Sequence, residues 1–268
     1  MEPTNHGKRS AMGTKSPEKR SDHSPAVHGD IASSSTGGAS SARKKVTDAI
    51  RLYRVLCKSL NEENMEVTNS SEIIKMVHIK AYKIFKEEKE SVHGGMQFIG
   101  SVPGVEIGDR FYYRIEMVLV DLHRPPMAGI DYMKGPNRDV IAVSVVASSD
   151  VDDMSSPHEL IYVGQGGISR SPGGESDRHC EEDQKLVGGN LALRNSIAVK
   201  NPVRVIRTVR ASIRDDRDLV THSKEVFVYD GLYVVEGCHE VRHGVNGRLK
   251  YYFTLKRLPG QPLNDHYC

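Results

Sequence analysis

The sequence has few cysteines and no long apolar run. Its four cysteines lie far apart and form no CxxC pair, so neither a disulfide framework nor a cysteine-rich zinc module is predicted. No window approaches the roughly 18 uninterrupted apolar residues of a membrane-spanning helix, and the N-terminus lacks the apolar core of a secretory signal. We therefore expect an intracellular protein with reduced thiols and no membrane contact.

Excess charge of either sign is also lacking. The chain of 268 residues has 37 Lys and Arg against 35 Asp and Glu, and 38% of its residues are hydrophobic, enough to bury a core. A formal net charge of +2 neither demands nor excludes a polyanionic partner. The placement of individual charges must decide that question.

The first part of the chain predicts a tail followed by helices. Residues 1–42 contain almost no large apolar side chains, which predicts a disordered tail. Apolar residues recur at spacings of three and four between 46 and 60, and a second such stripe begins after Ser71 and ends at the glycines following His93. We interpret 43–95 as a two-helix arm packed on the following domain; a coiled coil or a partner-binding arm are the alternatives.

From Met96 onward the sequence changes to short β-rich runs separated by glycines. One helix interrupts these runs, starting near Asn190 and closing at Asn201-Pro202. The pattern predicts an α+β fold with a strongly curved β-sheet or barrel and flanking helices. The predicted strands are Phe111–Leu122, Val140–Ala147, Leu160–Val163, Val203–Val209, Val226–Val235 and Tyr251–Leu255.

Several blocks, in order, carry a family resemblance. They read VPGVEIGDRF at 102–111, HRPPMAGIDY at 123–132, YVGQGG at 162–167, DQKL at 183–186, GNLAL at 189–193, PVRVIR at 202–207 and VYDGLY at 228–233. Together they resemble the SRA (SET- and RING-associated, or YDG) domain over residues 96–262, and we interpret 263–268 as a C-terminal tail. The arm before them is similar to the segment that precedes this domain in plant histone methyltransferases.

The resemblance implies a nuclear chromatin protein that binds double-stranded DNA and reads methylated cytosine by flipping the base. It implies no cofactor and no small-molecule substrate, with histone methyltransferases or other chromatin proteins as possible partners. The basic run 43–45 is suited to a nuclear address or a loose DNA contact. The sequence has no cysteine cluster of a pre-SET or RING type, so we expect no catalytic residues and no histone methylation by this chain alone.

A flipped cytosine presents an N4 amino donor and the N3 and O2 acceptors, so its pocket needs a carboxylate or carbonyl, donor groups and flat side chains. By resemblance, Asp153 faces N4, amides around Ala147 and Ser148 donate to the base, and Tyr162 stacks on it. The resemblance places Ser149, Asp150 and Val163 in the same pocket.

Two pocket positions depart from the family pattern. Asp150 stands where a second stacking tyrosine is expected, and Val163 stands in place of a threonine. Loss of an aromatic platform costs about 1–3 kcal/mol of base stacking. Two interpretations stay open: a reader of methylated cytosine, or a degenerate SRA module that acts as a chromatin interaction scaffold without methylcytosine specificity.

Two loops and one strand complete the predicted DNA interface. Met127-Ala128-Gly129 corresponds to the loop that enters the gap left by the flipped base, although an ordinary turn after two prolines fits too. A second loop, 168–182, carries Arg170 and Arg178 for the groove. The predicted phosphate contacts, which a cation-protected strand edge would equally explain, are Lys200, Arg204, Arg207 and Arg210.

One enzyme motif competes with this interpretation. Residues 239–243 read HEVRH and fit the H-E-x-x-H zinc protease pattern, which requires both histidines on one face of a helix. Flanking glycines instead predict a hairpin loop between two strands, and no third ligand follows at a useful spacing. We therefore expect no metal site.

Overall fold

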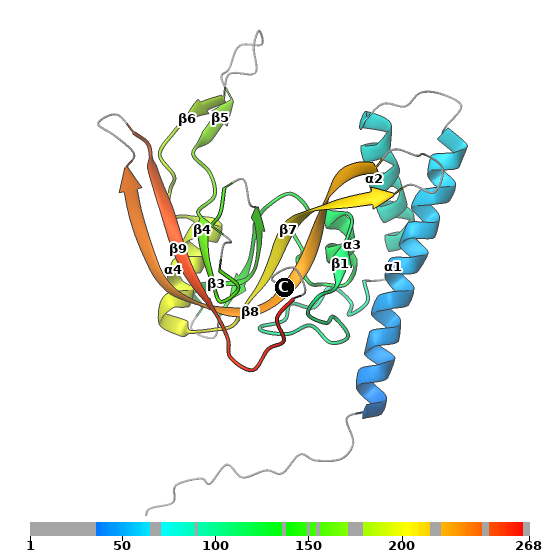
Figure 1. Cartoon of the computed structure of the whole chain (residues 1–268), viewed down its shortest axis with the longest axis horizontal. Coiled ribbons are helices and arrows are strands. Elements are labelled where there is room, and N and C mark those ends of the chain that lie inside the picture. The colour runs from blue at the N-terminus through cyan, green and yellow to red at the C-terminus, as the bar shows by residue number, and fades with distance from the viewer. Residues whose placement is uncertain are drawn as a thin grey trace, which may run out of the picture. The chain divides into compact units, whose positions relative to one another are not determined.

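The chain folds around one seven-stranded sheet with helices on its flanks (Figure 1). The computed structural model describes residues 36–64, 71–88, 91–135, 138–148, 151–153, 156–170, 179–214, 221–242 and 247–264. The strands of the sheet are β1 (Arg110–Phe111), β2 (Ile130–Lys134), β3 (Val140–Ser148), β4 (Glu159–Val163), β7 (Val203–Arg214), β8 (Thr221–Arg242) and β9 (Leu249–Arg257). A separate two-stranded sheet pairs β5 (Ile168–Arg170) with β6 (His179–Glu181).

The strand order is β2-β3-β7-β8-β9-β4, with β1 paired to β8. Strands β3 and β7 run parallel, and the other neighbours are antiparallel. The predicted mixture of helices and strands is confirmed. In the described part of the chain, however, β2 and β4 end the order without pairing to each other, so a closed barrel is not confirmed.

The predicted arm consists of α1 (Thr36–Asn64) and α2 (Ser71–Glu88), which pack side by side (Figure 1). Helix α1 begins at Thr36, so residues 36–42, predicted to be disordered, are helical; residues 1–35 lie outside the described residues. Helix α4 (Gly188–Val199) ends near the predicted position and packs against β3 and β8.

The predicted strand Phe111–Leu122 is wrong for most of its length. Only Arg110–Phe111 pairs as β1, and Arg114–Leu119 forms the helix α3. The aromatic and β-branched residues favour a strand locally, but Glu116, Met117 and Leu119 are buried together on α3. Packing against the arm therefore overrides the local preference.

The other predicted strands are confirmed, and β8 is longer than expected. It continues to Arg242, so residues 239–242 are extended rather than a hairpin loop, while His243 lies outside the described residues. An extended backbone does not place two histidines on one helical face, as zinc protease chemistry requires. Among the described residues, no group of three or more His, Cys, Asp or Glu could hold a metal ion, and no helix could cross a membrane.

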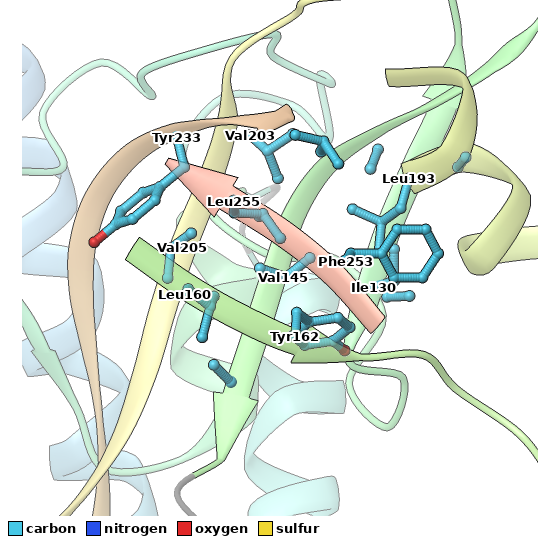
Figure 2. Close-up of a cluster of buried hydrophobic side chains, with 14 of the residues drawn as sticks. Ile130, Val145, Leu160, Tyr162, Leu193, Val203, Val205, Tyr233, Phe253 and Leu255 are labelled. Carbon is cyan, nitrogen blue, oxygen red and sulfur yellow. The ribbon is translucent and has the colours of Figure 1, made fainter. Parts of the chain in front are cut away.

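Strand β7 is buried on both of its faces from Val203 to Thr208. Val203 and Val205 belong to the core that α4 covers, shown in Figure 2, together with Leu160 and Tyr162 of β4. Ile206 points into a second core with Phe111 and other residues before β2. The sheet therefore separates two hydrophobic cores, and residues 203–208 of its central strand have no solvated face.

Candidate functional site

The predicted pocket segment, residues 147–153, begins at the end of β3 and lies between β3 and β4 in the chain. The Asp152 carboxylate accepts hydrogen bonds from the backbone amides of Ser148 (2.8 Å) and Val163 (2.7 Å) and so links the two strands. Beyond this link, Asp153 and Ile161 form an isolated antiparallel bridge with N–H···O distances of 3.0 and 3.1 Å. The segment is thus held at Asp152 by its side chain and at Asp153 by its backbone.

The two adjacent acids have different surroundings. Asp152 is 8% exposed, and burial raises its pKa to about 6 although two amides and Arg207 oppose the shift. Asp153 is exposed and is opposite Ile161 in the bridge. Sequence reasoning missed the structural role of Asp152, because which of two adjacent acids is buried depends on the strand that it meets.

Tyr162 lies where β4 meets the predicted insertion loop, Met127-Ala128-Gly129. Its side chain is 3% exposed within the core of Figure 2, and burial raises its pKa above the usual range for tyrosine. A Cβ on Gly129 would lie 2.7 Å from the Tyr162 hydroxyl and 2.6 Å from the side-chain amide of Gln165. The backbone of the insertion loop therefore passes directly over the end of the tyrosine.

Two side chains hold the insertion loop through one carbonyl. The Ala128 oxygen accepts from Arg114 Nη1 (3.1 Å) and lies 2.9 Å from His123 Nε2, while His123 Nδ1 lies 2.8 Å from Ser144 Oγ. Burial lowers the pKa of His123 to about 4, so the neutral ring donates from Nε2 and accepts at Nδ1. Next to the anchored Ala128, the Met127 side chain is 89% exposed. No feature of the sequence indicates that Arg114 and His123 support the loop.

The structure brings some predicted residues together and leaves others undescribed. Ala147 is buried in the sheet, and the Ser148 amide already bonds to Asp152, so in this conformation it is not the predicted donor to a base. Arg170 ends β5 opposite His179. Ser149, Asp150 and Arg178 lie outside the described residues.

The prediction of phosphate contacts is wrong for two of the four cations. Arg204 is 1% exposed and donates to the carbonyls of Leu122, Phe98 and Gly100 at 2.7–3.0 Å. Arg207 is 4% exposed and pairs with a buried aspartate. Both guanidinium groups are enclosed because β7 has a core on each face. Lys200 and Arg210 are exposed and stay candidates.

These features define a binding module of the mixed α/β class. It has an open mixed sheet, a segment between β3 and β4 that carries carboxylates, and beside that segment an anchored loop with the exposed Met127. Residues 98–261 match the family described as the SAD/SRA domain. The chain belongs to this family.

Curated relatives agree with the family assignment. The chain is 41% identical over 238 residues to the Arabidopsis thaliana histone-lysine N-methyltransferase SUVH5, covering 88% of this chain and 29% of that protein. It is 38% identical over 218 residues to the A. thaliana YDG domain-containing protein At5g47160, covering 80% and 49%. The chain therefore spans less than a third of the first relative and about half of the second.

Solved structures give the same fold. The SUVH5 SRA domain in complex with fully methylated CG DNA matches with a TM-score of 0.50 and 44% identity, over 63% of this chain and 99% of that chain. KRYPTONITE, solved with mCHH DNA, an H3(1–15) peptide and SAH, matches with a TM-score of 0.64 and 31% identity, over 83% of this chain and 44% of that one.

Proposed function

We propose that this chain binds double-stranded DNA and recognises methylated cytosine as a base flipped out of the duplex. The SUVH5 SRA domain, about 44% identical over nearly its whole length, has been solved with fully methylated CG, fully hydroxymethylated CG and methylated CHH DNA. The comparisons do not favour the alternative of an interaction scaffold without methylcytosine specificity.

The observation that carries the proposal is the meeting of the insertion loop and the pocket segment at β4. Gly129 lies so near Tyr162 that an added Cβ would meet its hydroxyl at 2.7 Å, and Ile161, one residue before Tyr162, bridges to Asp153. A base-flipping protein needs an element that fills the vacated stack close to the groups that hold the extruded base. Segments about 30 residues apart provide both elements here.

In this proposal Asp153, which is exposed, accepts from the cytosine N4 amino group. Met127 is the apolar wedge. Tyr162 stacks on the base once the groups that cover its ring move aside, because at 3% exposure it presents no open face. Arg170 and Arg178 would contact the groove, and Lys200 and Arg210 the phosphates.

The proposal extends to the setting of the chain. The strong curvature expected of the sheet would let the sheet wrap around the duplex. Residues 96–262 would form the reader domain, and residues 43–95 would form its arm. We propose a nuclear location and chromatin partners, since SUVH5 is a histone-lysine N-methyltransferase and KRYPTONITE was solved with a histone H3 peptide. The chain would act as a reader and not as an enzyme.

A binding titration with duplexes that are unmethylated, hemimethylated and fully methylated tests this function. We expect tighter binding to the methylated duplexes, and Asp153→Ala should remove about 1–3 kcal/mol of that preference, the typical contribution of a specific base contact. Asp139→Ala, which removes another exposed carboxylate near β3, is the matched control. Equal affinity for all three duplexes, with no effect of Asp153→Ala, would disprove the proposal.

A further inference from the structure

A buried charge cluster surrounds Asp230 of the Tyr-Asp-Gly triplet. Asp230 has no exposed surface, and its Oδ2 accepts from Arg207 Nε (2.7 Å) and the Tyr233 hydroxyl (2.6 Å). Its Oδ1 accepts from Asn264 Nδ2 (2.7 Å) and lies 3.2 Å from Arg257 Nη1. Burial alone would raise the pKa of Asp230, but the guanidinium groups and the tyrosine hydroxyl hold it below its usual value. The carboxylate is therefore a fixed anion between two cations.

The cluster also holds the turn at residues 156–158, which leads into β4. Arg207 Nη2 donates to the carbonyl oxygen of Ser156 at 3.2 Å, and the backbone amide of Arg257 donates to the carbonyl of His158 at 2.9 Å. Ser156 and His158 lie between the two bridge partners, Asp153 and Ile161. Movement of this turn would therefore shift the segment that carries Asp153.

Arg207 acts on the other end of the same segment through its charge. The positive charge of Arg207 lowers the pKa of Asp152, against the larger effect of burial. Ionised Asp152 is the group that ties Ser148 to Val163. The Arg207 guanidinium thus acts on Asp152 through its charge and on Ser156 through a direct hydrogen bond.

We propose that Arg207, oriented by Asp230, is a positioning residue for the cytosine pocket that fixes how Asp153 is presented. The inference rests on the proposed function and extends it to a side chain that touches neither base nor phosphate. Recognition groups discriminate best when a surrounding layer of hydrogen bonds holds them in one geometry. A buried ion cluster that bonds to the turn supplies such a layer.

The test compares Arg207→Lys with Arg204→Lys in the full chain. Both arginines lie on β7 and are almost fully buried, but Arg204 bonds to carbonyls of Leu122, Phe98 and Gly100, away from the pocket segment. Both variants keep the positive charge and lose the planar fork. Melting temperatures would establish that each variant folds and how much stability each loses.

The first readout is the ratio of the dissociation constants for unmethylated and fully methylated duplexes. Loss of a charge-assisted hydrogen bond predicts a roughly tenfold fall in this ratio for Arg207→Lys, with unmethylated affinity changed less than about twofold. Arg204→Lys should leave the ratio unchanged. An unchanged ratio in folded Arg207→Lys, or an equal fall in both variants, would overturn the proposal.

The second readout is amide hydrogen exchange of residues 151–163, which needs no DNA. Arg207→Lys should speed exchange of the Asp153 and Ile161 bridge amides, and Arg204→Lys should not. If the wild-type chain shows no methyl preference while this exchange difference is present, the proposed function fails but the positioning of the segment holds. If exchange in Arg207→Lys matches wild type, the positioning role itself is refuted.

Discussion

At position 129 the chain passes so close to its neighbours that only glycine fits. A Cβ there would meet the Tyr162 hydroxyl and the Gln165 amide at 2.7 and 2.6 Å, and Tyr162 is buried and has little freedom to retreat. We predict that Gly129→Ala destabilises the fold by about 1–3 kcal/mol, as overpacking of a well-packed site does. It should also weaken DNA binding, because the insertion loop is displaced.

Urea unfolding and duplex titration would measure these effects. Gly237→Ala is the matched control, because a Cβ there would meet nothing closer than His239 Nε2 at 3.9 Å. Equal stability losses in the two variants would contradict the contact between the insertion loop and Tyr162.

His123 predicts a pH dependence of stability. Its folded pKa of about 4 lies below the usual value near 6.5, so below pH 6.5 the unfolded chain binds the proton more readily. The contribution of the neutral ring is complete above pH 6.5 and is lost as the pH falls toward 4. Asp152, whose pKa is raised to about 6, has the opposite sign: its contribution is lost as the pH rises from about 4 to 6.

Comparison with a His123→Gln variant separates these two effects, because Asp152 is common to both proteins. Wild type should lose up to about 3 kcal/mol of stability relative to the variant between pH 6.5 and pH 4. Urea unfolding at several pH values would measure the difference, and parallel pH profiles would exclude the assigned state of His123.

Which arginines face solvent could not be predicted from the residues of β7 alone. In the run Val203 to Arg207, the two arginines stand three residues apart on either side of the adjacent Val205 and Ile206, which defines no single solvated face. The structure places a core on each side, so Arg204 and Arg207 bond to buried carbonyl and carboxylate groups instead. That outcome depends on what covers each face, which is a long-range property of the fold.

At the scale of elements, the ion pair between Arg54 and Glu116 is one of those that join the arm to the sheet domain. Arg54 of α1 contacts Glu116 of α3 through two hydrogen bonds of 2.8 and 3.0 Å, and Glu116 has no exposed surface. Arg54→Ala would leave that carboxylate buried without its cation. We predict a loss of about 2 kcal/mol, less than for a fully buried pair because Arg54 is 38% exposed.

The free energy of unfolding in urea would measure this loss. Arg51→Ala on the exposed part of the same helix should change stability by less than about 0.5 kcal/mol. Similar losses in both variants would mean that the ion pair does not fasten the arm.

The same contact explains why α3 was mistaken for a strand. Local composition decides between helix and strand only weakly, and the run after Phe111 is rich in aromatic and β-branched residues. The helix is stabilised by Glu116 meeting Arg54, more than 60 residues earlier. Helices α1 and α4 were predictable from their apolar residues and the signals at their ends, and the strands β3, β7 and β9 from runs rich in β-branched and aromatic residues.

At the scale of the whole molecule, the even charge balance means that DNA affinity must come from a few well-placed cations. Once Arg204 and Arg207 are assigned to the interior, the predicted phosphate contacts that stay exposed are Lys200 and Arg210. Family membership was predictable from ordered sequence blocks. Which cations lie in the core and which on the surface could not be predicted, because that depends on the order of the strands in the sheet.

Salt dependence of binding tests that division. Each phosphate contact releases condensed counterions, so Lys200→Ala and Arg210→Ala should each reduce the slope of log K against log salt by about 0.9. The reduction should be the same for methylated and unmethylated duplexes, because phosphates carry no sequence information. Lys83→Ala, which removes an exposed cation of α2, is the control and should leave the slope unchanged. A slope that stays constant in both variants would mean that other cations contact the phosphates. A change confined to methylated duplexes would mean that Lys200 or Arg210 lies near the flipped base.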